Sequence, residues 1–294
     1  MLNVCVIGTG NIGIDLTEKI LKESSFNMVA LVGRRAESPG LKRFEGRVPI
    51  FTRGLQEVLA LGVGIDLVFD ASSADSHQSH WTALKSKGIP VIDLTPSRLG
   101  KPTVPGFLGL EMGDFSEPLN YSMITCGGQG AVPIVTAFAK SADSIDYVEV
   151  SSSISAVSAG PATRANIDDY IGATENAVKI ASRARTTKAI LILNPSSPPI
   201  FMRTTVYVSG DFKPFEEVNR EVEFAIAHVQ KYVPGYRVQV PLLMKDRTVS
   251  ITVGVEGAGD YLPSFAGNLD IMTAAAIRKA KDLFISKESE YVKN

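Results

Sequence analysis

Three glycines near the amino terminus constrain the fold of this chain more than any other feature. Gly8, Gly10 and Gly13 form a G-x-G-x-x-G pattern directly after the apolar run of residues 4–7, and a helical pattern follows them. In a strand–turn–helix unit the first glycine permits a tight turn, the second lets a pyrophosphate approach the backbone, and the third lets helix and strand pack closely. A purely structural turn is the alternative. We predict a dinucleotide site formed by Gly8, Thr9, Gly10, Asn11, Ile12 and Gly13.

The end of the next apolar run, residues 28–32, bears on which dinucleotide is bound. An acidic residue there would bind the ribose diol of NAD, whereas arginine accommodates the 2′-phosphate of NADP. This chain has Arg34 and Arg35 at that point and no carboxylate before Glu37. Both arginines could simply be solvated loop charges. Otherwise they favour a protein that accepts NADP as well as NAD.

Strand and helix patterns alternate through the first part of the chain. Apolar runs at residues 65–70 and 90–94 flank a helical segment at 76–86. This alternation predicts a doubly wound parallel sheet. The helical segment carries His77 and His80, whose spacing would suit a metal pair, but no third ligand lies near them in the sequence. We therefore expect surface or interface histidines and no metal site.

The second of the two cysteines, Cys126, lies between an apolar run at 121–124 and a helical segment at 130–140 that has a proline in its first turn. The amino end of a helix stabilises a thiolate, which is the nucleophilic form of cysteine. Gly127 and Gly128 would let a substrate approach the sulfur, and backbone N–H groups beside this Gly-Gly turn would stabilise an oxyanion. The alternative is a buried free cysteine that only fills the core.

The pattern changes after residue 140. Long strands with alternating polarity, such as 147–157 and 248–255, predict an α+β domain on an antiparallel or mixed sheet. A helix after a capping box at Asn166 carries Tyr170 on its apolar side, and a terminal helix is expected to have Asn268 as its N-cap. Two domains are therefore expected: a dinucleotide-binding domain of residues 1–125 with 268–294, and a catalytic and dimerisation domain of 126–267.

The composition of the chain indicates its cellular compartment and excludes some classes of binding partner. The chain has 294 residues, 45% of them hydrophobic and 21% charged, with a net charge of −1. These values are ordinary for a globular protein and argue against nucleic acid or a membrane surface as a partner. The two cysteines form no disulfide framework, which fits a reducing compartment. The longest apolar runs are too short to cross a bilayer. We expect a cytoplasmic protein.

Six long segments, spread in collinear order over nearly the whole chain, occur together in a known family. They are residues 8–13, 125–129, 158–166, 232–237, 261–263 and 266–273. They resemble the acylating acetaldehyde dehydrogenases, which act with 4-hydroxy-2-oxovalerate aldolase in meta-cleavage pathways of aromatic hydrocarbon catabolism. The resemblance implies an N-terminal Rossmann domain and an α+β domain like that of glyceraldehyde-3-phosphate dehydrogenase.

The same resemblance implies an activity and a site. It implies that Cys126 forms an acyl thioester with acetaldehyde or a similar short aldehyde, that NAD is the cofactor, and that coenzyme A takes the acyl group. It implies a homodimer, and it makes an aldolase a potential partner. Further cofactor contacts are implied for Ser158, Ala159, Gly160, Pro161, Ala162, Thr163, Arg164, Ala165, Asn166 and Asn268.

The chain departs from the family pattern at three places. Family members carry an acidic residue, a proposed acid/base group, where this chain has Thr204, and they tend to have Ile-Asp in place of Arg34-Arg35. The segment between Tyr236 and Val255 is shorter than in the aldolase-partnered members. These departures bear on proton transfer, on the choice of NAD and on the aldolase, and no base is assigned.

Three other functions remain open at this point. A phosphate-dependent aldehyde dehydrogenase would form an acyl phosphate on the same scaffold. A reductase of imines or carbonyls would keep the fold and use no covalent cysteine. A non-catalytic NAD-binding, redox-sensing subunit would bind the dinucleotide without turnover.

Overall fold

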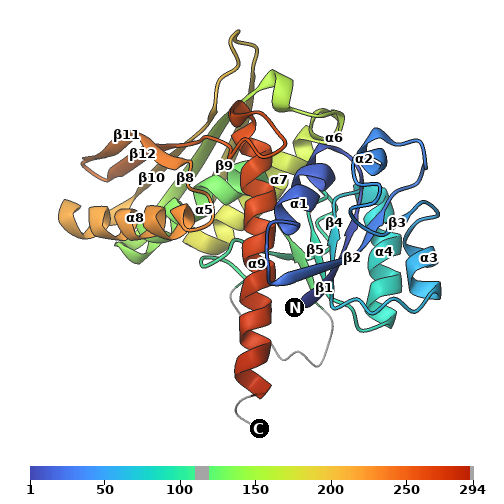
Figure 1. Ribbon diagram of the computed structural model, residues 1–294. Helices are drawn as coiled ribbons and strands as arrows, with labels where there is room; N and C mark the ends of the chain where they lie inside the picture. Colours follow the sequence, from blue (N-terminus) through green and yellow to red (C-terminus); the bar gives the residue numbers. More distant parts are fainter. Residues whose placement is uncertain (110–118, 292–294) are drawn as a thin grey trace. The chain divides into compact units, whose positions relative to one another are not determined.

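The chain forms two compact units in the computed structural model, which describes residues 1–109 and 119–291 (Figure 1). The first unit holds the described residues 1–105, 109, 119–123 and 276–291. The second holds residues 106–108 and 124–275.

The first unit is built on a seven-stranded sheet with the order β3-β2-β1-β4-β5-β7-β6 (Figure 1). Every pairing in this sheet is parallel, which confirms the predicted doubly wound sheet. The strand order reverses between β1 and β4, the point where such sheets bind ligands at the carboxyl ends of their strands. The strands are β1 (Leu2–Ile7), β2 (Phe26–Val32), β3 (Ile50–Phe51), β4 (Leu67–Asp70), β5 (Val91–Asp93), β6 (Lys101–Pro102) and β7 (Asn120–Ser122).

The core of this unit lies between the sheet and its helices α1 (Asn11–Ile20), α2 (Pro39–Lys42), α3 (Leu55–Ala60) and α4 (Ala74–Ser86). Cys5, Ile7, Val32, Leu55, Val68 and Leu84 belong to one buried apolar cluster. Burial raises the pKa of the Cys5 thiol, so this cysteine remains protonated and packs as a small hydrophobic side chain.

The second unit is a five-stranded sheet with the order β11-β12-β10-β8-β9. The pairing of β8 with β9 is parallel and the other pairings are antiparallel, which confirms the predicted mixed sheet. Its helices α5 (Cys126–Lys140), α7 (Ile167–Ser182) and α8 (Phe215–Gln230) cover one face (Figure 1). The strands are β8 (Ala142–Ser155), β9 (Thr186–Asn194), β10 (Met202–Phe212), β11 (Tyr236–Lys245) and β12 (Thr248–Val255).

The opposite face of this sheet carries large side chains. Along β10 buried and more exposed residues alternate, so one set of side chains packs under the helices and the other points away. Tyr207 is 42% exposed on this outer set and Ile192 of β9 is 46% exposed. Apolar side chains exposed on one sheet face are typical of an association surface.

Strand β11 is one element that the pattern of the sequence does not predict. Pro241 lies inside it, and a proline cannot donate a backbone hydrogen bond to a neighbouring strand. The structure accommodates Pro241 because β11 is an edge strand whose register shifts on both sides of Val240. An irregular edge is one of the positions where a sheet tolerates proline.

The terminal helix α9 (Gly267–Tyr291) begins in the second unit and ends in the first. The predicted N-cap at Asn268 is wrong, because the helix already begins at Gly267. A side chain at Gly267 would overlap the backbone of Val255, so this close approach to β12 requires glycine. Within the described ranges, no helix combines the length and apolar character that crossing a membrane requires.

Candidate active site

The glycine loop has the geometry that its sequence predicts. Gly8 has φ of +112°, and a side chain there would overlap the backbone of Ala71 at the end of β4. A side chain at Gly13 would overlap the Gly8 carbonyl, so helix α1 and strand β1 approach closely. Gly10 differs, because a Cβ added there would meet no atom within 4 Å. The loop therefore leaves open space directly over Gly10, where a pyrophosphate would fit.

Two adjoining hollows surround this loop, and they share Thr9 and Arg34. The larger, of about 510 Å³, is lined by Thr9, Arg34, Arg35 and Ser38. The smaller, of about 210 Å³, is lined by Ile7, Gly8, Thr9, Gly10, Val32, Gly33, Arg34, Gly54, Ala71, Ser72, Ser76 and His80. Three of the predicted loop residues, Gly8, Thr9 and Gly10, and both predicted arginines therefore line these hollows, whereas Asn11, Ile12 and Gly13 line neither.

The larger hollow is polar and positively charged. Arg34 and Arg35 are exposed, and within the described residues neither forms an ion pair. The nearby Glu37 carboxylate is 2.7 Å from Lys42 Nζ. The Thr9 and Ser38 hydroxyls lie 2.9 Å apart at the same hollow. A phosphate monoester accepts hydrogen bonds from cationic groups and hydroxyls, and this hollow offers two of each.

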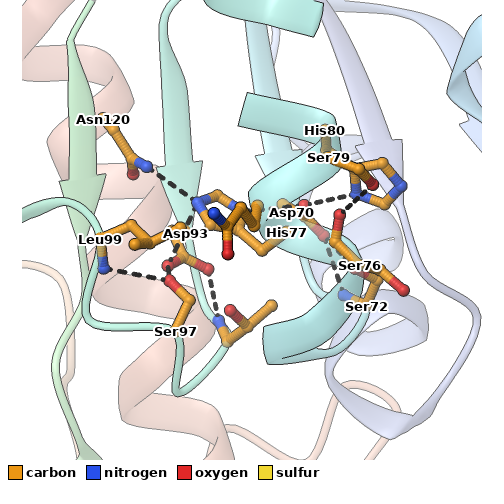
Figure 2. Close-up of polar contacts among 12 residues, drawn as sticks. Asp70, Ser72, Ser76, His77, Ser79, His80, Asp93, Ser97, Leu99 and Asn120 are labelled. Carbon is orange, nitrogen blue, oxygen red and sulfur yellow. Dashed lines mark hydrogen bonds and ion pairs between the residues drawn. The ribbon is translucent and has the colours of Figure 1, made fainter. Parts of the chain in front are cut away.

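A buried polar network lies at the carboxyl ends of β4 and β5 (Figure 2). The Asp70 Oδ2 atom is 2.9 Å from His77 Nδ1 and 2.8 Å from His80 Nδ1. On its other side, His77 Nε2 is 2.8 Å from Asn120 Nδ2 and 3.4 Å from Asp93 Oδ2. The prediction of a surface or interface histidine is wrong for His77, which is fully buried. The parallel strands bring both carboxylates to one sheet edge, and α4 runs over them.

The charges of this network shift one another's pKa values. Burial raises the pKa of Asp70, but hydrogen bonds from His77 and His80 outweigh it and hold that pKa well below the usual range. Burial lowers the pKa of His77, but the Asp70 hydrogen bond and the Asp93 charge outweigh it, so the net pKa is raised. The Asp93 pKa is raised, because burial outweighs its contacts. Among the described residues, no group of three metal-ligating side chains could hold a metal ion.

Cys126 is the first residue of helix α5, between a strand and a helix as predicted. Its sulfur is buried, since the residue is 8% exposed. The Thr125 hydroxyl caps the helix by accepting from Gly128 N–H at 2.9 Å, and it lies 2.7 Å from the Thr174 hydroxyl. The predicted place of Pro133 in the first turn is wrong, because the glycines after Cys126 are themselves helical and Pro133 lies inside the helix.

A tyrosine contacts the cysteine. Tyr170 Oη lies 3.6 Å from Cys126 Sγ and accepts a hydrogen bond from Gly127 N–H at 2.9 Å. From the sequence, Tyr170 is predicted only as a helix residue on the apolar side. The signal that could have found this contact is the hydroxyl itself, since a buried tyrosine O–H requires a polar partner.

The structure bears on two expectations about Cys126. Burial raises the pKa of the Cys126 thiol and outweighs the lowering by Tyr170 and by backbone N–H groups, so the helix start alone does not make a thiolate. An oxyanion is expected to bind backbone N–H groups beside the Gly-Gly turn, and two of the groups at this turn, Gly127 N–H and Gly128 N–H, already donate to Tyr170 Oη and to Thr125 Oγ1.

The predicted cofactor contacts in the second unit are the segment of residues 158–166 and Asn268. Residues 158–166 form the end of a 3-10 turn (Ala156–Ser158), the helix α6 (Pro161–Ala165) and the residue before α7. Arg164 donates to the backbone carbonyls of Ala156 and Ala159, so its guanidinium holds this segment in shape. The predicted capping box is wrong, because the Asn166 side chain makes no cap hydrogen bond. Asn268 is buried, and within the described residues its Oδ1 atom has no hydrogen-bond partner.

A doubly wound sheet with a glycine loop, joined to a domain in which a cysteine begins a helix, defines a dehydrogenase-type oxidoreductase. Residues 126–263 match the family model for prokaryotic acetaldehyde dehydrogenase, dimerisation. Similar chains include acetaldehyde dehydrogenases of Geobacillus thermodenitrificans (strain NG80-2), 43% identical over 96% of this chain and 95% of that relative, and of Spirochaeta aurantia, 43% identical over 96% and 94%. Another, from Pectobacterium atrosepticum, is 43% identical over 94% and 93%. The chain belongs to the acetaldehyde dehydrogenase family.

Proposed function

We propose that this aldehyde dehydrogenase is acylating: it oxidises acetaldehyde or a similar short aldehyde and transfers the acyl group from Cys126 to coenzyme A. The observation that carries the proposal is the position of Cys126, a single thiol at the start of α5 with the Tyr170 hydroxyl 3.6 Å from its sulfur. Coenzyme A as acceptor is supported by the family resemblance.

The proposed reaction has three steps. The Cys126 thiolate attacks the aldehyde carbonyl carbon, forming a carbon–sulfur bond and an oxyanion. A bound nicotinamide dinucleotide would accept the hydride that leaves this carbon. Loss of hydride restores the carbonyl and leaves an acyl thioester on Cys126. The thiolate of coenzyme A then attacks that carbonyl and displaces the Cys126 thiolate. The balance is one aldehyde, one CoA thiol and one oxidised cofactor giving one acyl-CoA, one reduced cofactor and one proton.

The residues around the glycine loop fit a dinucleotide. The open space over Gly10 would take the pyrophosphate, and the hollow beside Arg34 and Arg35 would take the adenosine ribose, with NADP accepted as well as NAD. The unpartnered Asn268 Oδ1 atom and the segment of residues 158–166 are our proposed contacts in the second unit. A buried amide oxygen without a donor is available to a ligand.

We also propose a cytoplasmic homodimer. The outer face of the five-stranded sheet, with Ile192 and Tyr207 exposed, would pair with its copy. Both cysteines are free thiols, which fits a reducing compartment. An aldolase partner, implied by the family resemblance, remains a further proposal.

The test is reduction of NAD and of NADP with acetaldehyde or propanal, with coenzyme A present or replaced by phosphate. CoA-dependent turnover that is lost in Cys126→Ser, while that variant still binds the dinucleotide, is the expected result. Turnover with phosphate alone would assign an acyl phosphate product instead. Turnover that survives in Cys126→Ser would indicate a hydride-only reductase, and binding without turnover in the wild type would indicate a sensor.

A further inference from the structure

The Tyr170 hydroxyl has one proton to donate and three polar neighbours with which it can form hydrogen bonds. Gly127 N–H donates to Tyr170 Oη at 2.9 Å, so one acceptor position of the oxygen is filled. The Tyr170 proton can then point to Cys126 Sγ, 3.6 Å away, or to Ser152, whose side chain also hydrogen-bonds Tyr170. The hydroxyl can therefore donate its proton either to the sulfur of Cys126 or to Ser152.

Two further hydroxyls, both uncharged, lie next to this contact. The Ser152 hydroxyl lies 3.1 Å from the Thr204 hydroxyl, and both residues are 1% exposed. Among the described residues, Tyr170 is the one side chain that hydrogen-bonds Cys126 Sγ. A side chain at position 127 would overlap the Tyr170 and Ser152 hydroxyl oxygens, so Gly127 leaves the room in which they meet.

We propose that Tyr170 is a catalytic residue that donates its O–H to the Cys126 thiolate, and so stabilises the sulfur when it attacks and again when it leaves. This rests on the proposed function for both events, because the attack of the Cys126 thiolate on the aldehyde and its departure as the acyl group passes to coenzyme A are steps of that proposal. A hydrogen bond to a charged sulfur is stronger than one to a neutral thiol, so the contact favours the charged states selectively.

The hydroxyl needs only to rotate for this role. In the thiol state Cys126 S–H can donate to Tyr170 Oη while the Tyr170 O–H points to Ser152. When the thiol loses its proton to solvent, the Tyr170 O–H turns to the sulfur. In the thioester the sulfur is neutral and the O–H returns to Ser152. Tyr170 keeps its proton throughout, because burial holds the pKa of its phenol well above the usual value. It acts as a donor and not as a base.

The test measures the thiolate directly. The ultraviolet absorbance of the thiolate is followed against pH as the difference between each protein and its Cys126→Ser counterpart. Tyr170→Phe removes the hydroxyl alone. We expect the Cys126 titration midpoint to move up by about one to two pH units, the effect of losing a hydrogen bond to a charged group, and turnover at neutral pH to fall about tenfold to a hundredfold.

Tyr236→Phe is the matched control. Tyr236 is also buried, and its hydroxyl donates to Gly130 O at 2.7 Å on the same helix, α5. This variant should keep the wild-type midpoint. Equal midpoints in the wild type and Tyr170→Phe, or an equal shift in Tyr236→Phe, would overturn the proposal. A shift in Tyr170→Phe together with no CoA-dependent turnover by the wild type would uphold the Tyr170 contact and reject the acylating function.

Discussion

The His77 Nδ1 atom lies 2.9 Å from the Asp70 Oδ2 atom, and both side chains are fully buried. A buried carboxylate needs a cation or several donors to offset its lost hydration. Asp70 has a second imidazole, His80, at 2.8 Å from the same oxygen, and the Ser72 N–H and hydroxyl bind its other oxygen. The carboxylate is therefore favoured in its ionised form, and its hydrogen bond raises the pKa of His77.

The contact between Asp70 and His77 should contribute most to the stability of the protein at mildly acid pH. The lowered pKa of Asp70 contributes stability above the unfolded value of about 3.9, and this is lost as pH falls through the folded value. The raised pKa of His77 contributes stability below the unfolded value of about 6.5, and this is lost as pH rises through the folded value. Melting temperatures measured as a function of pH check both losses of stability, the one at acid pH and the one at alkaline pH.

Substitution of His77 separates the acid limb of the stability profile, which Asp70 sets, from the alkaline limb, which His77 sets. His77→Gln should remove the loss of stability on the alkaline side and lower the melting temperature at acid pH. Gln78→Ala, at an exposed position next to His77 on α4, should keep the wild-type profile. The interpretation fails if the alkaline limb persists in His77→Gln.

Two glycine variants should distinguish folding from cofactor binding. Gly10→Ala places a methyl group in open space, so the melting temperature should stay near that of the wild type while dinucleotide affinity falls at least tenfold, because the methyl occupies the pyrophosphate position. Gly13→Ala overlaps the Gly8 carbonyl and should lower both affinity and stability, the latter by about 1–3 kcal/mol. Calorimetric titration with NAD and thermal unfolding measure the two effects, and unchanged NAD affinity in Gly10→Ala would contradict this role of the loop.

The arginine hollow should discriminate between the two cofactors. Arg34→Ala and Arg35→Ala each remove one charge-assisted contact to a 2′-phosphate, so the dissociation constant of NADP should rise about tenfold or more while that of NAD changes little. Lys87→Ala, an exposed charge of the same unit that lines neither hollow, is the control for net charge. An equal loss of NAD and NADP affinity would show that the arginines do not select the phosphate.

The outer sheet face should hold the dimer together. Tyr207→Asp places a charge among the exposed side chains of β10 and should convert the dimer to a monomer in sedimentation experiments. Phe224→Asp is the matched control, because Phe224 is 61% exposed on α8, which covers the opposite face of the sheet. Dissociation by Phe224→Asp and not by Tyr207→Asp would place the interface on the helices.

The elements that sequence pattern predicts well are those whose signal is local. The glycine loop is one, because each glycine answers a steric requirement of the strand–turn–helix unit that contains it, as Gly8 and Gly13 show. The mixed sheet of the second unit is predicted from the alternation of its strands. Strand β11 is missed, because Pro241 argues against a strand unless the neighbouring register is known.

In the candidate site, too, local features could be predicted from the sequence and contacts between distant segments could not. Sequence by itself determined that Cys126 stands between a strand and a helix and that Arg34 and Arg35 follow the second strand, since both facts concern neighbours along the chain. Tertiary structure decided that His77 is buried between two carboxylates and that Tyr170 meets Cys126 Sγ, 44 positions away. It also decided that burial outweighs the helix start in setting the Cys126 pKa. Desolvation and long-range hydrogen bonds depend on which surfaces pack together, and no local pattern in the chain carries that information.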